Sequence, residues 1–125
     1  MNVAAQVAYW RAGSDEDIAA AESLIEKGHP RHALFFAHLA VEKLLKAHVC
    51  RVTQDVAPRV HDLFRLAELA GLRLWPERAV LLARFQKYCL EGRYPDPGPL
   101  ATAEEAQRGL AEAREMRAWL MSLLP

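Results

Sequence analysis

The sequence predicts an all-α fold, an antiparallel up-and-down bundle of four long helices and one short helix. Three observations support this prediction. The segment from Pro30 to Val52 has almost no polar face in its first half and is far too long for a strand. No alternating run of β-branched residues occurs anywhere. Glycines, prolines and capping residues divide the remaining sequence into segments of helical length. Because a helix that is apolar nearly all round is normally surrounded by others, the segment from Pro30 to Val52 is predicted to be the central one.

The first predicted helix runs from about Val3 to Lys27 and carries an apolar stripe and an acidic face. Gly13 and Ser14 interrupt its pattern, and Ser14 resembles an N-cap that would begin a second helix. We expect one helix, because the apolar residues before and after the glycine fall on the same side. The stripe consists of Tyr9, Trp10, Ile18, Ala21, Leu24 and Ile25.

The first and central helices are predicted to form an antiparallel hairpin. Gly28 ends the first helix, and Pro30 begins the next after a very short turn. Proline suits the first helical turn because its missing N–H would have no partner there. We expect the most buried helix to include residues 33–49, with Phe35 and Leu44 in the core.

Two further helices are predicted after a loop that contains Pro58. The short third helix begins at His61-Asp62, where Asp62 is a candidate N-cap, and Gly71 ends it. The fourth helix runs from Pro76 to about Glu91, and Gly92 caps it. Its inward-facing residues are Leu81, Leu82, Phe85, Tyr88 and Cys89, and its outer face carries Arg78, Arg84, Lys87 and Glu91.

The last predicted helix follows a proline-rich segment. Alternate prolines between residues 95 and 99 hold residues 93–99 extended and exclude a helix there. Thr102 and Glu105 then form a capping box. Apolar residues recur at helical spacing after it, at Ala103, Ala106, Leu110, Ala113, Met116, Leu120 and Leu124.

Composition excludes several classes of protein. At 125 residues, residues 1–125 are expected to form a single domain. Lys plus Arg and Asp plus Glu number 16 each, so the net charge is zero and gives no general electrostatic affinity for nucleic acid. Near-zero charge also does little to oppose self-association. The central apolar run contains charged residues and no signal peptide precedes the first helix, so we expect a cytoplasmic protein with no membrane span.

Motifs for metal binding or nucleophilic catalysis are missing. The sequence has no HExxH, CxxC or paired Glu-x-x-His motif, so we expect no metal, and the histidines are interpreted as satisfied residues in or beside the core. It also has no G-x-S-x-G motif and no glycine-rich phosphate loop, and we expect no cofactor. Cys50 and Cys89 lie within predicted helices and are interpreted as buried thiols.

A few polar residues leave functional alternatives open. Glu42 and Lys46 are four residues apart in the orientation that favours a helix-surface ion pair, but Lys43 or Lys46 could instead reach a phosphate. Arg93 precedes Tyr94 in a proline-stiffened loop, where a guanidinium suits bidentate phosphate recognition. Arg93 equally suits tying this loop to the last helix through Glu104 or Glu105.

Three motifs resemble the HEPN domain family in order and spacing. The run from Ala37 to Ala47 is similar to the family's central helix, with an alanine-rich approach followed by Glu-Lys, two apolar residues and Lys-Ala. The tripeptide His61-Asp62-Leu63 matches a His-Asp-Leu motif, and residues 93–96 match an Arg-Tyr-Pro-Asp motif. The resemblance covers essentially the whole chain.

The resemblance implies a helical bundle that usually forms a homodimer. Small stand-alone members often form a complex with a minimal nucleotidyltransferase, and many such pairs are toxin–antitoxin modules. The family name refers to nucleotide binding, so the resemblance implies a nucleotide- or RNA-phosphate-binding site. The candidate residues are Arg93, Tyr94, Asp96, Lys43, Lys46 and His61.

Many HEPN proteins are metal-independent RNases, but this sequence departs from their pattern. Those RNases carry, late in the fold, an arginine followed after four to six residues by a histidine, whereas no histidine follows His61 here. Arg31 and His38 have this spacing but lie on the second predicted helix and not at the family position. Metal-free RNA cleavage usually needs a histidine that transfers protons near neutral pH. We therefore expect a non-catalytic or weakly catalytic partner of a nucleotidyltransferase. The alternatives are an RNase toxin with an atypical active site and a purely structural interaction module.

Overall fold

The fold consists of five helices, and a computed structural model describes it for residues 2–93 and 100–125, without the side chains of 91–93. The helices are α1 (Val3–Glu26), α2 (Pro30–Thr53), α3 (Leu63–Leu69), α4 (Pro76–Arg93) and α5 (Ala103–Ser122). The described residues contain no strand. The predicted all-α fold with four long helices and one short helix is confirmed.

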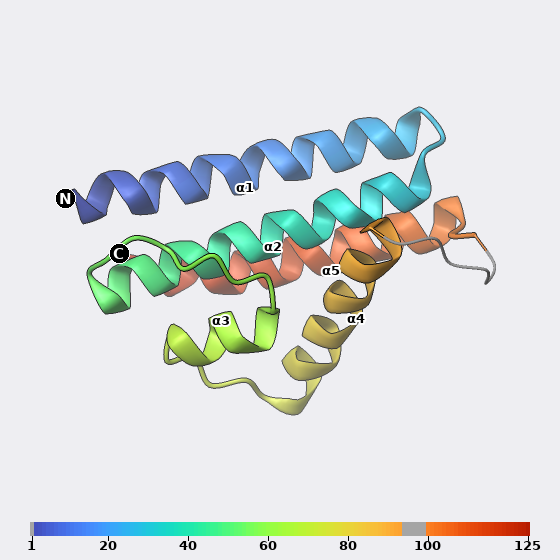
Figure 1. The fold of residues 1–125 in the computed structure, drawn as a ribbon. Helices are drawn as coiled ribbons and strands as arrows, with labels where there is room; N and C mark the ends of the chain where they lie inside the picture. The colour runs from blue at the N-terminus through green and yellow to red at the C-terminus, as the bar shows by residue number, and fades with distance from the viewer. Residues whose placement is uncertain (1, 94–99) are drawn as a thin grey trace.

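Helix α2 is the centre of the molecule and packs against each of the other four helices. Figure 1 shows α1 antiparallel to α2, with α5 lying along α2 and α4 crossing these helices at a steep angle. Helix α3 lies beside the C-terminal half of α2. No helix among the described residues is both long and apolar enough to cross a membrane.

The core is built mainly on α2, as predicted. Leu44 has no exposed surface, and the buried positions of α2 run almost without interruption from Ala40 to Cys50. Phe35 is only half-buried, so its prediction as a core residue is wrong. Phe35, Phe36 and Leu39, which lies one helical turn later, form a partly exposed strip of α2. The neighbouring helices cover this strip incompletely.

Helix α1 is continuous through Gly13 and Ser14, as predicted. These small residues allow α1 to approach α2 closely. A Cβ on Gly13 would lie 3.1 Å from Cδ of Lys43. The fully buried Ser14 donates a hydrogen bond from Oγ to the carbonyl oxygen of Ala40, at 2.7 Å. Tyr9, predicted on the apolar stripe, is 68% exposed. Neighbouring residues point about 100° apart on a helix, so Trp10 faces inward and Tyr9 does not.

The ends of the shorter helices follow the predicted caps with one exception. Oδ1 of Asp62 accepts hydrogen bonds from the backbone N–H groups of Phe64 and Arg65 at the start of α3. Oγ1 of Thr102 accepts one from the N–H of Glu105, at 3.1 Å. The prediction that Gly92 caps α4 is wrong, because α4 continues to Arg93. A glycine within a helix costs only about 1 kcal/mol, which does not by itself end the helix.

Candidate functional site

The buried carboxylate of Glu42, in the middle of α2, gathers two of the predicted site residues. Glu42 is 4% exposed. Its Oε2 lies 3.5 Å from Nζ of Lys46 and 3.3 Å from Nδ1 of His61. Its Oε1 lies 3.5 Å from Nε2 of His38, one turn earlier on α2. A carboxylate, an ammonium and two imidazoles therefore meet here, and of these groups only the His61 imidazole is exposed.

The predicted ion pair between Glu42 and Lys46 exists, but its prediction as a solvated surface pair is wrong. The two side chains are only 5% and 7% exposed. Nζ of Lys46 lies 5.2 Å from the ring centroid of Trp10, so α1 covers the pair and the aromatic ring adds a favourable contact with the cation. A phosphate that bound Lys46 would have to enter a covered site and compete with a carboxylate.

Lys43 does not join Lys46, although both are predicted phosphate ligands. Its Nζ lies 2.8 Å from Oδ2 of Asp17 on α1, and its side chain is 28% exposed. It lines a small hollow of about 130 Å³ with Tyr9, Trp10 and Glu16. The structure therefore assigns the two lysines to two separate carboxylates.

Helix α5 is joined to α1 by a second set of polar contacts. Nε of Arg117 donates to Oγ of Ser14, at 2.8 Å, and its Nη2 contacts Asp15. Nη2 of Arg114 contacts Glu22, farther along α1. Part of the acidic face of α1 is thus neutralised by arginines of α5.

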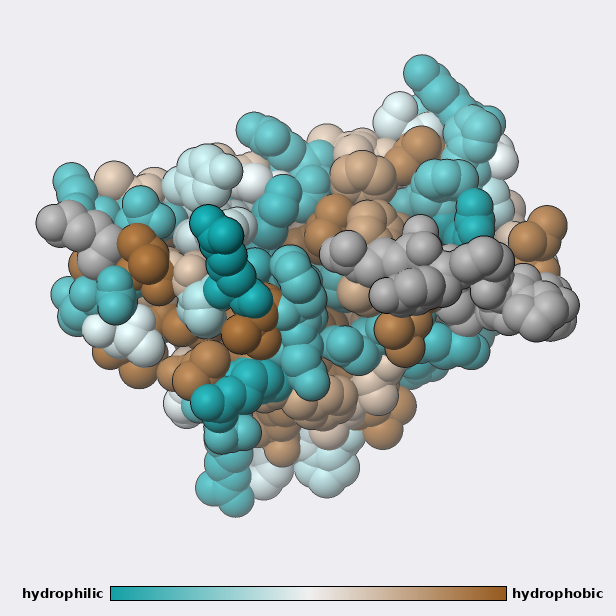
Figure 2. Space-filling view, viewed as in Figure 1, coloured by the Kyte–Doolittle hydropathy of each residue, from teal (hydrophilic) through white to brown (hydrophobic). Residues whose placement is uncertain are grey.

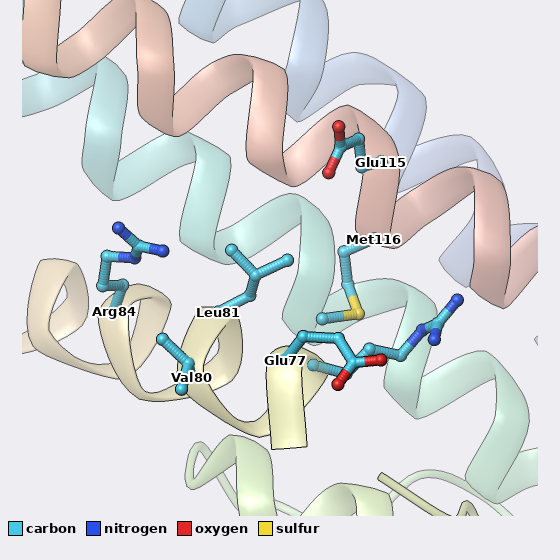
Figure 3. A pocket seen from close by; sticks show the side chains of 7 residues that line it. Glu77, Val80, Leu81, Arg84, Glu115 and Met116 are labelled. Atoms are coloured by element: carbon cyan, nitrogen blue, oxygen red, sulfur yellow. The ribbon is translucent and has the colours of Figure 1, made fainter. Parts of the chain in front are cut away.

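A groove of about 530 Å³ lies between α4 and α5. Leu81 of α4 and Met116 of α5 point toward each other across it, as Figure 3 shows. Its remaining lining residues are Glu77, Arg78, Val80, Arg84 and Glu115. The volume is that of a small-molecule site. Sequence reasoning missed this groove, because only the packing of the two helices brings these residues together.

Both arginines of the groove already have partners. Nη2 of Arg84 lies 2.9 Å from Oε2 of Glu112 on α5. The guanidinium of Arg78 lies 4.1 Å from the ring centroid of Trp119. With Glu77 and Glu115 also lining the groove, the carboxylates balance the guanidiniums, so the groove does not have the excess positive charge that an anion-binding site needs.

Two buried groups of the core, His48 and Cys50, favour their neutral forms. Burial lowers the pKa of His48, so its imidazole is neutral and its Nε2–H donates to the carbonyl oxygen of Leu120, at 2.7 Å. Burial raises the pKa of the Cys50 thiol, which favours the unreactive protonated form. Cys50 and Cys89 are buried and not joined by a disulfide, as predicted. The described residues contain no group of three side chains that could hold a metal ion.

Comparison with known proteins decides the family. The HEPN domain family matches residues 7–123. This chain is a HEPN domain protein. The fold is similar to that of TT1696 from Thermus thermophilus, with a TM-score of 0.80 over 99% of this chain and 100% of that one. The two sequences are 23% identical, and at that level the likeness shows a shared fold. No curated protein matches the sequence.

The HEPN motif His61-Asp62-Leu63 attaches α3 to the rest of the domain. The imidazole of His61 contacts the buried Glu42, and Asp62 caps α3. Leu63 is fully buried, and its N–H donates to Oε1 of Gln86 on α4, at 3.0 Å. Each residue of the motif thus has a structural contact in this HEPN protein.

The HEPN motif at residues 93–96 falls outside the described side chains. Arg93 is the last residue of α4, and the structure describes its backbone but not its side chain. Tyr94 and Asp96 lie in the segment that the structure does not describe. The alternatives for Arg93, a phosphate contact or a tie to Glu104 or Glu105, therefore both stay predictions.

Proposed function

We propose that this HEPN protein is a non-catalytic or weakly catalytic homodimer that works with a minimal nucleotidyltransferase in a two-component, toxin–antitoxin-like system of the cytoplasm. Membership of the HEPN family over nearly the whole chain supports the proposal. So does the sequence, in which no histidine follows Arg93 to complete the RNase motif. A protein of this kind acts mainly through the surfaces it presents to its partner.

The observation that carries this proposal is the engagement of the candidate phosphate-binding lysines inside the fold. Lys43 is paired with Asp17, and Lys46 is paired with the buried Glu42. Releasing either lysine for a phosphate would leave a largely buried carboxylate without its counter-charge, which is costly. These lysines therefore favour a structural role, which fits a binding partner better than an enzyme of nucleotide or RNA chemistry.

Capture from the native host tests the partnership. The tagged full-length protein is expected to co-purify with a small nucleotidyltransferase in a fixed stoichiometry, as determined by mass spectrometry and light scattering. Reconstitution from the two purified proteins should give the same ratio. A capture that returns no nucleotidyltransferase, together with failed reconstitution, would contradict the proposal.

Any nucleotide or RNA phosphate is expected to contact Arg93, with Tyr94 and Asp96 beside it. Arg93→Ala should weaken the binding of ATP or of a short RNA while leaving the melting temperature unchanged. Arg108→Ala, at an exposed position of α5, is the matched control and should change neither quantity. If melting falls and binding persists, Arg93 ties the loop to α5 instead.

One observation favours the alternative of an RNase with an atypical active site. The side chain of His61 is 58% exposed, and its Nδ1 lies 3.3 Å from the buried Glu42 carboxylate. A carboxylate that orients an imidazole in this way leaves Nε2 available for proton transfer. RNA cleavage in the presence of a chelator, lost in His61→Ala, would support this alternative. Absence of cleavage by the wild-type protein would leave the binding role.

A further inference from the structure

Helix α4 presents an apolar stripe to the outside of the molecule. Its exposed positions between residues 80 and 90 include Val80, Ala83, Lys87 and Leu90, which we call the α4 stripe. Val80 is 57% exposed and Leu90 is 54% exposed. Figure 1 shows α4 at the edge of the molecule, and Figure 2 shows apolar surface along the same side, where α3 and α4 lie.

The spacing of the stripe is that of a helix-pairing seam. Positions 80, 83, 87 and 90 are separated by three, four and three residues, as are the a and d positions of a heptad. Residues at this spacing form one continuous line along a helix that packs against a second helix. Over these positions the line is about 15 Å long.

Large aliphatic side chains distinguish α4 from the other described helices. Among the residues in the described helices, only α4 carries two large aliphatic side chains that are each more than half exposed. The comparable residues elsewhere are isolated, such as Val52 in the last turn of α2, or lie outside helices, such as Val56 and Leu100. Isolated exposed apolar residues are normal, but a regular line of them marks an interaction surface.

We propose that the α4 stripe is the interface through which two copies of this chain pair, with their α4 helices antiparallel. The proposal rests on the homodimer in the proposed function and assigns it a surface. A two-fold axis beside residue 85 would place Val80 against Leu90 of the partner subunit. The same axis would place Ala83 against the methylene stem of Lys87 of the partner subunit. A two-fold interface requires this reciprocity, in which each contact occurs twice.

The charges beside the stripe also suit a second copy. The groove between α4 and α5 adjoins the stripe at Val80, and its rim carries two arginines and two glutamates. A surface with balanced charges has little attraction for a strongly acidic or basic partner, whereas a rotated copy of itself can offset each sign. A stable interface buries about 800 Å² on each partner, so the groove rim and the stripe would have to be buried together.

A charge-exchange experiment tests this geometry. Light scattering after size exclusion, at micromolar concentration, should give a dimer for the wild-type protein. Val80→Lys and Leu90→Glu, each made alone, should weaken dimerisation by at least about tenfold, because each places a charge against an apolar side chain. The double variant Val80→Lys with Leu90→Glu should recover dimerisation, since both two-fold related contacts then join opposite charges. All of these positions are exposed, so the helix content should not change.

Two controls separate this interface from dimerisation in general. Val52→Lys, at a position of α2 that is 50% exposed, should leave the dimer intact. The double variant Val80→Glu with Leu90→Glu should remain monomeric, because like charges then meet. A dimer that all the α4 variants preserve would overturn the interface assignment but not the homodimer. A monomeric wild-type protein would overturn both.

Discussion

The two flanks of α2 and α5 use similar charged residues in different surroundings. On the flank that α1 covers, the Glu42–Lys46 pair has side chains that are 5% and 7% exposed. On the α4 flank, Arg84 and Glu112 form a pair at the side of an open groove, and their side chains are 43% and 16% exposed. The covered flank has little room for a ligand, while the open flank keeps apolar surface accessible. Burial, more than residue type, is therefore expected to decide how much an ion pair contributes to the stability of this protein.

The largest expected effect is at Glu42. Glu42→Leu leaves Lys46 covered without its counter-charge and should lower the free energy of unfolding by about 3–5 kcal/mol. Urea denaturation followed by circular dichroism measures this loss. The double variant Glu42→Leu with Lys46→Leu should lose less than Glu42→Leu alone, since it removes the unpaired charge. If the double variant instead loses the sum of the two single losses, the Glu42–Lys46 pair is not energetically coupled, and burial does not set this flank apart from the open one.

A smaller effect is expected where α1, α2 and α5 meet at Ser14. Ser14→Ala removes the hydroxyl that donates to the carbonyl of Ala40 and accepts from Arg117. Losing these two hydrogen bonds at a buried position should cost about 1–3 kcal/mol in denaturant unfolding. Ser23→Ala, at an exposed position of the same helix, is the matched control and should stay within about 0.5 kcal/mol of wild type.

The covered core should also make stability depend on pH through His48. Because burial lowers its pKa in the folded state, the unfolded chain takes up a proton first as the pH falls below the ordinary value of 6.5. The contribution of His48 to stability is therefore present above pH 6.5 and is lost as the pH falls toward the lowered pKa of the folded state. Melting temperatures measured between neutral and mildly acidic pH should fall more steeply for wild type than for His48→Gln.

The smallest effect is expected on the open flank. Arg84→Ala should cost no more than about 1 kcal/mol, because water screens a half-exposed pair and added salt weakens it further. Arg65→Ala breaks an ion pair with Glu68 in which both side chains are exposed. This variant should show a similarly small loss of stability. A loss from Arg84→Ala as large as that from Glu42→Leu would contradict the comparison of the two flanks.

Local sequence signals predicted the helices well, because helix formation and capping depend on neighbouring residues. The proline at the start of α2, the cap at Asp62 and the cap at Thr102 all lie where the sequence indicated. The glycine at position 92 misled the prediction, since helix α4 tolerates it. The HEPN family could also be identified from short motifs, and the family match over residues 7–123 confirms it.

Packing between distant segments limited the prediction of the site. Helical spacing predicted a pair between Glu42 and Lys46, but only the position of Trp10 shows that the pair is covered. Similarly, no local pattern relates Arg84 to Glu112 or reveals the groove between their helices. Phe35 and Tyr9 failed as inward-facing residues because a hydrophobic side chain does not specify which neighbour is present to cover it.

The contact between Ser14 and Arg117 has a consequence for synthesis, because it joins residues that are 103 positions apart. The hairpin of α1 and α2 is local and can form as soon as both helices leave the ribosome. Helix α5 emerges last, roughly 4 to 14 seconds later at ordinary rates of translation. During that interval the surface of α2 that α5 will cover stays open to water. A nascent chain stopped before residue 103 is therefore expected to be a substrate for chaperones, although its first two helices are complete.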